Sequence, residues 1–150
     1  MGLSCDAQHP TAPRADGSGM AAAMARALAR AGLPPEAVDT ICAHGSGTLA
    51  SDAAEARAIG ALFPHRPPVF GLKGALGHSL GAATAVEAAV CVLALRAGCL
   101  PPTVGHEVQD AAMALDVLTA PRAAPGLRHV LSGGFAFGGL NSALLLGPAS

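Results

Sequence analysis

Two histidines of the sequence each lie in a glycine-rich stretch that could carry chemistry. His44 begins HGSGT directly after a short run with β-branched residues, and His78 lies in GHSLG, just before or within the first turn of a long apolar helix. A helix N-terminus disfavours protonation, so we expect a neutral His78 that can donate a hydrogen bond. Two neutral imidazoles that meet at one carbonyl oxygen would stabilise an enolate.

Two charged residues near His78 strengthen this interpretation. Lys73 precedes His78 by five residues, and Glu87 follows it by nine. An isolated buried lysine is unfavourable, so Lys73 is expected to pair with a carboxylate, either Glu55 or Glu87. Such an ion pair can be purely structural, and it can also set the electrostatics of a site.

GHSLG also fits the G-x-S-x-G pattern of a serine hydrolase, with Ser79 as the nucleophile. Asp110 or Asp116, followed by His129, could complete a triad. The pattern requires a strand immediately before the motif, and the preceding GLKGAL, with two glycines and a lysine, makes a poor buried strand. The hydrolase is therefore the less favoured interpretation.

The elements that position these residues alternate between helix and strand. Periodicity and turn residues predict helices at 19–31, 52–62 and 79–96, and strands at 38–43, 67–72, 114–118, 129–134 and 141–147. Ser51 is expected to cap the second helix, with Asp52 and Glu55 in its first turn. The third helix is apolar nearly all round, which predicts a buried central helix. This order predicts an α/β layered fold with a mixed sheet.

The composition narrows the possible functions. A chain of 150 residues with 51% hydrophobic and 13% charged residues predicts one domain over residues 1–150. A net charge of −1 with scattered arginines disfavours nucleic acid, and Glu87 in the middle of the most apolar segment disfavours a membrane span. The four cysteines lack zinc-site spacing. We therefore expect no metal, and reduced core thiols in a cytoplasmic protein.

Besides the two histidines, the sequence contains four longer motifs, two of which include His44 and His78. They are DAQHPTAP (6–13), HGSGTLASDAAE (44–55), KGALGHSLGAATAVE (73–87) and SGGFAFGGLN (132–141). Together they resemble the C-terminal half of the β-ketoacyl-acyl carrier protein synthases, which are condensing enzymes of the thiolase fold. The resemblance implies the C-terminal half of a thiolase-like layered fold. It also implies decarboxylative Claisen condensation of acyl and malonyl thioesters, in fatty acid or polyketide synthesis.

The resemblance assigns the chemistry to the histidines, because Ser79 stands at a variable position of its motif. It implies that His44 and His78 bind the malonyl thioester carbonyl and stabilise the enolate, and that Lys73 sets the electrostatics of the site. The acidic residues expected to support this network are Asp52, Glu55 and Glu87.

The same resemblance implies the substrate contacts. Ser46 and Thr48 would bind the phosphopantetheine arm of acyl carrier protein, and no bound cofactor is expected. Phe135 would gate the acyl pocket and donate its backbone N–H to an oxyanion hole, although a loop phenylalanine could equally be core. Phe137 and Gly138 are expected to contact the substrate.

Some residues depart from the family pattern. Gly133 and Gly134 stand where the family commonly has Asn and Ser, and Leu140 replaces a polar residue. The motif of the nucleophilic cysteine, which belongs to the N-terminal half, matches none of the four cysteines. We therefore expect a second ketosynthase chain, or the N-terminal half, to supply the nucleophile. A non-catalytic partner resembling a chain-length factor is the alternative. The first strand of the C-terminal half is also expected to be missing, which would leave a sheet edge uncovered.

Overall fold

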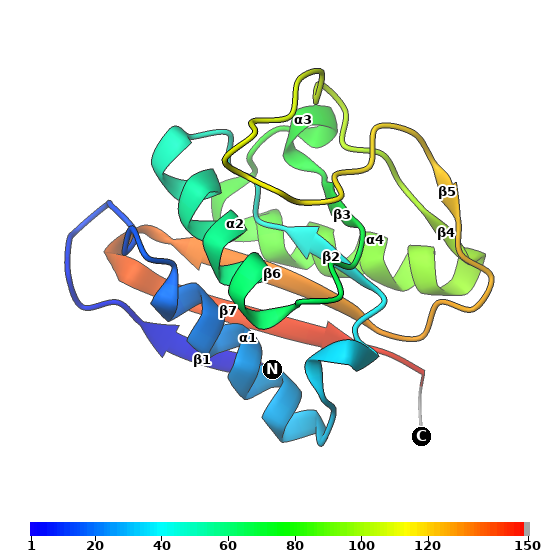
Figure 1. Cartoon of the computed structure of the whole chain (residues 1–150), viewed down its shortest axis with the longest axis horizontal. Coiled ribbons are helices and arrows are strands. Elements are labelled where there is room, and N and C mark those ends of the chain that lie inside the picture. Colours follow the sequence, from blue (N-terminus) through cyan, green and yellow to red (C-terminus); the bar gives the residue numbers. More distant parts are fainter. Residues whose placement is uncertain (149–150) are drawn as a thin grey trace.

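The computed structural model describes residues 1–148 and contains one mixed sheet of five strands (Figure 1). The order across this sheet is β1 (Gly2–Cys5), β7 (Leu140–Leu146), β6 (Val130–Ala136), β2 (Thr40–Ala43) and β3 (Val69–Gly71). β2 runs parallel to β6 and β3, whereas β7 is antiparallel to β6 and β1. The carboxyl ends of β2, β3 and β6 therefore meet at one edge, which is where parallel sheets build their binding sites.

Helices cover both faces of the sheet (Figure 1). α1 (Ser18–Ala31) and α2 (Leu49–Leu62) lie on one face, and α4 (Ala83–Ala97) lies on the other. α1 packs through one apolar stripe, because Met20, Met24 and Leu28 are all buried. It ends at Gly32, which adopts the left-handed conformation with φ 64° that glycine tolerates best.

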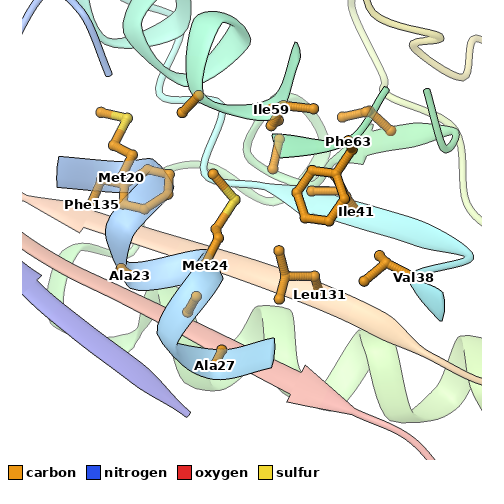
Figure 2. Close-up of a cluster of buried hydrophobic side chains, with 14 of the residues drawn as sticks. Met20, Ala23, Met24, Ala27, Val38, Ile41, Ile59, Phe63, Leu131 and Phe135 are labelled. Atoms are coloured by element: carbon orange, nitrogen blue, oxygen red, sulfur yellow. The ribbon is translucent and has the colours of Figure 1, made fainter. Parts of the chain in front are cut away.

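The buried side chains form one apolar cluster on each face of the sheet. Ile41 and Leu131 belong to the cluster under α1 and α2, with Met24 and Phe63 (Figure 2). Their neighbours in sequence face the other way, and Cys42 joins the cluster beneath α4. This alternation is the period of two that strands impose on their side chains.

The smaller elements connect these layers. They are α3 (Lys73–Leu76), the short paired strands β4 (Cys99–Leu100) and β5 (Arg122–Ala123), and single helical turns at Pro35–Ala37, Leu80–Ala82 and Phe137–Gly139. The strands predicted at 38–43, 67–72, 129–134 and 141–147 correspond to β2, β3, β6 and β7. The segment predicted at 114–118 contributes only an isolated bridge between Val117 and Val69.

The predicted start of α2 was wrong by three residues. The helix begins at Leu49, and its N-cap is Thr48, whose hydroxyl oxygen accepts the Ser51 N–H at 3.4 Å. Thr48 is therefore the cap and Ser51 lies inside the helix. Asp52 does occupy the first turn, as predicted, whereas Glu55 lies beyond it, because the helix begins three residues earlier.

α4 differs from the buried central helix that its composition predicts. The α-helix begins at Ala83, after the helical turn Leu80–Ala82, and its outer side exposes Val86, Val92 and Leu93. Leu80–Ala97 is long and apolar enough to cross a membrane by length and composition, a test that core helices also pass. Its central carboxylate, Glu87, is buried in an ion pair with Lys73, which indicates a helix packed against protein.

The first strand, expected to be missing, is present as β1. It pairs antiparallel with β7 at the edge of the sheet. On the open side of β1 the Arg26 guanidinium donates to the Leu3 carbonyl at 2.6 Å. This contact satisfies one of the backbone groups that an edge strand would otherwise expose.

Candidate active site

His44 follows the carboxyl end of β2 and is nearly buried, with 7% of its surface exposed. The loop after it turns through Gly45 and Gly47, whose φ angles of 47° and 80° favour glycine. Glu55 reaches back from α2 to this loop. Its two carboxylate oxygens accept the backbone N–H of His44 at 2.7 Å and of Gly45 at 2.9 Å. Burial raises the pKa of Glu55 to about 7, although both N–H donors favour the charged form.

His78 lies between α3 and the turn Leu80–Ala82, and its side chain is exposed. The α-helix begins only at Ala83, so the argument from the helix dipole does not apply at His78. Its orientation comes from the backbone instead, because the Leu80 N–H donates to His78 Nδ1 at 3.1 Å. Leu80 itself adopts a positive φ of 50°. A neutral His78 then carries its proton on Nε2.

The two histidine rings meet at the carboxyl edge of the sheet. Their centroids are 5.5 Å apart, and the ring planes cross at 79°. The Nδ1 of His44 is also occupied, since the Phe135 N–H and the Lys73 ammonium each lie 3.4 Å from it. Both rings therefore keep Nε2 as the nitrogen that can donate to a ligand.

Burial, with smaller contributions from nearby charges, keeps the His44 ring neutral. Burial lowers the pKa of His44 to about 4, with further lowering by the charges of Lys73 and His78. The Lys73 ammonium donates to the His44 carbonyl and forms an ion pair with Glu87 at 2.5 Å. Of the two carboxylates that the sequence left open, Glu87 is thus the partner of Lys73. Among residues 1–148, the second oxygen of Glu87 is buried without a hydrogen-bond partner.

The two phenylalanines of FAFGG occupy different environments. Phe135 lies inside β6 and not in a loop, and its ring is buried near Met20 (Figure 2). Its centroid is 5.8 Å from that of His44, and its N–H points at the His44 ring. Phe137 lies in the turn beyond the strand and is 77% exposed. Phe135 is thus part of the core, and its role as the gate of an acyl pocket stays a prediction.

Three of the remaining predicted residues, Ser46, Thr48 and Asp52, lie in the loop after His44 or in the first turn of α2. The hydroxyls of Ser46 and Thr48 lie 3.2 Å apart. Asp52 accepts the Gly47 N–H at 3.2 Å and so holds the loop, without pairing with Lys73. Gly138 has a φ of 79° in the turn that carries Phe137. Between residues 1 and 148, no group of three or more His, Cys, Asp or Glu side chains could hold a metal ion.

Two positioning residues lie in the quoted motifs but were not singled out from the sequence. Asp6 is buried and accepts Asn141 Nδ2 at 2.7 Å and the Arg14 N–H at 2.9 Å. The Gly138 N–H donates to the Pro10 carbonyl at 2.6 Å. These bonds tie the N-terminal segment to the turn of Phe137. Asp6 and Asn141 lie near opposite ends of the chain, so the sequence around either residue does not predict that they pair.

The structure contradicts the hydrolase interpretation. Ser79 follows α3 and Gly77, whereas a nucleophile elbow needs a strand at that place. His129 precedes the amino end of β6, and its Nδ1 lies 3.0 Å from the Ala37 carbonyl. The histidine pair lies at the opposite end of these parallel strands. Asp116 is bound to Arg122 at 2.8 Å, so no triad forms around Ser79.

A family model described as the C-terminal domain of β-ketoacyl synthase matches residues 1–107. The chain belongs to the β-ketoacyl synthase family. The chain is 41% identical over 146 residues to 3-oxoacyl-[acyl-carrier-protein] synthase 2 of Mycobacterium leprae, and the match covers 97% of the chain. It is 40% identical over the same length to the namesake enzyme of Mycobacterium tuberculosis. The match covers 35% of each relative, so the chain spans about a third of their length.

Solved structures agree with this assignment. The ishigamide ketosynthase/chain length factor superposes with a TM-score of 0.93 at 42% identity, over 99% of this chain and 37% of that one. A β-ketoacyl synthase from Burkholderia phymatum gives 0.93 at 36% identity, over 99% and 36%. The predicted α/β fold of the thiolase-like ketosynthases, represented by its C-terminal half, is therefore confirmed.

Proposed function

We propose that this chain is the C-terminal portion of a β-ketoacyl-acyl carrier protein synthase and supplies two histidines for decarboxylative condensation. The observation that carries the proposal is the convergence of His44 and His78, with centroids 5.5 Å apart and both Nδ1 atoms occupied. Two Nε2–H donors are then available to a single oxygen. Preorganised donors of this kind stabilise charge as it develops on that oxygen.

In the proposed reaction the bond between the malonyl carboxylate and its α-carbon breaks, and carbon dioxide leaves. The electron pair passes into the thioester, and the enolate oxygen accepts hydrogen bonds from His44 and His78. The enolate carbon then attacks an acyl thioester held on a cysteine. The new carbon–carbon bond forms as the cysteine thiolate leaves. A neutral His44, with its pKa lowered to about 4, can donate throughout this sequence.

The nucleophilic cysteine is proposed to come from a second chain or an N-terminal portion. Cys42 and Cys91 are buried, and the neighbouring Cys91 and burial raise the pKa of Cys42, which makes it a poor nucleophile. Cys5 and Cys99 are exposed, but neither lies in a catalytic motif. The apolar outer side of α4, with Val86, Val92 and Leu93, is a surface that such a partner would cover.

Acyl carrier protein is the proposed carrier of both substrates, through its phosphopantetheine arm, with no other cofactor. A related structure contains a type II polyketide acyl-carrier protein with its ketosynthase, at 29% identity to this chain. On this proposal the hydroxyls of Ser46 and Thr48, which lie 3.2 Å apart, bind the arm, and the exposed Phe137 contacts the acyl chain. A cytoplasmic location follows from this substrate.

A chain-length-factor-like subunit is the second candidate. One similar structure, from Xenorhabdus doucetiae at 39% identity, is a ketosynthase in complex with its chain length factor. The replacement of polar residues by Gly133 and Leu140 favours this role. In that case the chain would shape the pocket of an intact synthase, and its own histidines would not affect the rate.

The experiment joins this chain to the N-terminal portion of the Mycobacterium leprae synthase, ending where the similarity to this chain begins. The two are mixed as separate polypeptides and also fused, so that failure to associate is distinguished from failure of chemistry. Decarboxylation of malonyl-acyl carrier protein is the readout. His44→Ala or His78→Ala should lower the rate by about 10²–10³-fold, as the loss of one oxyanion donor does.

Ser79→Ala is the matched control, and it should retain the rate because Ser79 takes no part in the reaction. Unchanged rates in both histidine variants of an active fusion would refute the catalytic role. If the histidine variants instead changed only the length of the product made by an intact synthase, the chain would be a chain-length-factor-like subunit and not a catalytic one.

A further inference from the structure

Two consecutive glycines lie inside the buried central strand β6, where glycine is normally unfavourable. Gly133 and Gly134 are both buried, and neither has a positive φ that would require glycine. Glycine within a strand often marks a place where another group approaches closely. Because successive residues of a strand face opposite sides, each glycine admits a different neighbour.

Gly134 faces the first turn of α4. A β-carbon built on it would overlap the Cγ2 methyl of Thr84 and would lie 2.9 Å from Ser142 Oγ. Thr84 therefore rests directly on the bare backbone of β6. The bare backbone sets how closely the start of α4 approaches the sheet.

The contact between Thr84 and Gly134 is linked through α4 and the turn before it to both Lys73 and His78. One turn beyond Thr84, Glu87 holds Lys73 at 2.5 Å. Just before Thr84 lies the turn Leu80–Ala82, and the Leu80 N–H holds His78 Nδ1. A shift of the first turn of α4 would move His78 and Lys73 together, relative to His44 on β2.

Gly133 faces the opposite side and admits the Phe135 ring. A β-carbon on Gly133 would lie 2.9 Å from Phe135 Cζ, 3.0 Å from its Cε2 and 3.5 Å from Glu55 Oε1. The ring thus folds back along its own strand into the space of the missing side chain. Phe135 donates its N–H to His44 Nδ1, and Glu55 binds the His44 backbone.

We propose that Gly133 and Gly134 are positioning residues that set the spacing of the two histidines. Gly134 seats Thr84 and thereby places His78, whereas Gly133 seats the Phe135 ring beside His44. Side chains at these positions change the distance between the imidazoles without touching either one. The pair therefore acts through its neighbours and contacts no substrate.

The test uses the full chain, with ¹⁵N-labelled histidine and no partner, so that it does not depend on the proposed function. In wild type, ring protons of His44 and His78 should show a nuclear Overhauser contact, since the centroids are 5.5 Å apart. Gly134→Ser introduces the residue that the family commonly has at this position, but beside the Thr84 methyl of this chain it should remove the contact between the rings. It should also raise the His44 pKa above about 4, because burial still lowers it but the smaller contributions of the Lys73 and His78 charges weaken.

A second substitution makes the test specific. In Gly134→Ser, the new side chain would overlap the Cγ2 methyl of Thr84, and Thr84→Ala removes that methyl. The double variant Thr84→Ala/Gly134→Ser should therefore regain the contact between the two histidine rings and the wild-type titration of His44. Non-additivity of this kind is what a direct steric coupling produces. Gly60→Ser is the control, because Gly60 on α2 has no atom within 4 Å of its missing side chain.

A folded Gly134→Ser chain with wild-type His44 titration and ring contact would overturn the proposal. So would a folded double variant that remains as perturbed as Gly134→Ser alone. In the active fusion, Gly134→Ser should lower decarboxylation by about 10²-fold, the effect of misplacing a reacting group by about 1 Å, and Thr84→Ala should restore it. A fusion that is inactive with the wild-type chain refutes the proposed function, and the resonance measurement still decides on the glycines.

Discussion

At the scale of single residues, the site depends on a histidine that stays neutral because it is buried. His44 lies beneath Lys73 and beside His78, and burial together with these charges lowers its pKa to about 4. Its backbone is fixed by Glu55 and its ring by the Phe135 N–H. The ring therefore presents one nitrogen in one protonation state over the physiological range.

This neutral histidine predicts a pH dependence of stability. Between pH 6.5 and about pH 4 the unfolded chain binds a proton at His44 that the folded chain does not. The free energy of unfolding should therefore fall as the pH decreases through this window. Urea denaturation at several pH values measures it, and His44→Gln should reduce the slope. Equal slopes in both proteins would contradict the account.

The pair of Lys73 and Glu87 predicts an asymmetric response to substitution. Their side chains are only 7% and 2% exposed. Lys73→Met leaves Glu87 buried without its partner and should lower the free energy of unfolding by about 3–5 kcal/mol. Lys73→Met/Glu87→Leu removes both charges and should be milder. Chemical denaturation compares them, and a double variant at least as unstable as Lys73→Met would argue against the pair.

The sequence predicted the histidines and Lys73 because ordered motifs contain them. It left Glu55 and Glu87 as alternatives, since both lie on helices whose rotation is set by packing. It left Phe135 as either a gate or a core residue and placed it in a loop, whereas the strand extends through Phe135 and leaves Phe137 exposed. Where a strand ends depends on its neighbours, here β7, and not on the FAFGG stretch alone.

At the scale of elements, strands and helices could be predicted where periodicity is strong, but their ends could not. The methionine stripe of α1 needs only local sequence. The start of α4 was placed too early because Leu80–Ala82 fit the same apolar pattern. Leu80 instead takes a φ of 50°, and this interrupts the α-helix before Ala83. Strain of this kind is a common feature of functional sites.

Two glycines near α2 should respond in opposite ways to alanine. Gly60 lies on the exposed side of α2 with open space around it, so Gly60→Ala should raise the free energy of unfolding by about 0.5–1 kcal/mol. Gly17 caps α1 with a φ of 71°, and its β-carbon would overlap the Ala54 carbonyl. Gly17→Ala should therefore destabilise the chain. Thermal denaturation of both variants is the measurement, and equal effects would contradict the assigned backbone roles.

At the scale of the whole molecule, the chain presents the site without a complete enclosure. His78 and Phe137 are exposed, and α4 is open along its outer side. The sequence predicted that α4 is buried on all sides, because α4 has the apolar composition of a helix that is packed all round. The discrepancy is explained if the rest of a ketosynthase covers this side, since the chain spans 35% of its relatives.

This explanation predicts a substitution that affects association alone. Leu93 is 61% exposed on α4, so Leu93→Glu should change the stability of the chain by no more than about 0.5 kcal/mol. It should nevertheless weaken binding to the N-terminal portion of the Mycobacterium leprae synthase, measured by calorimetry. Ala61→Glu, on the exposed side of α2 across the sheet, is the control and should bind normally. Equal affinity for both variants would show that α4 is not the contact.

The most direct measurement is a crystal structure of the active fusion with a malonyl thioester analogue that does not decarboxylate. The account predicts that the thioester oxygen lies about 2.7–3.1 Å from the Nε2 atoms of both His44 and His78. An analogue bound in the site with its oxygen held by one ring only, or by neither, would contradict it.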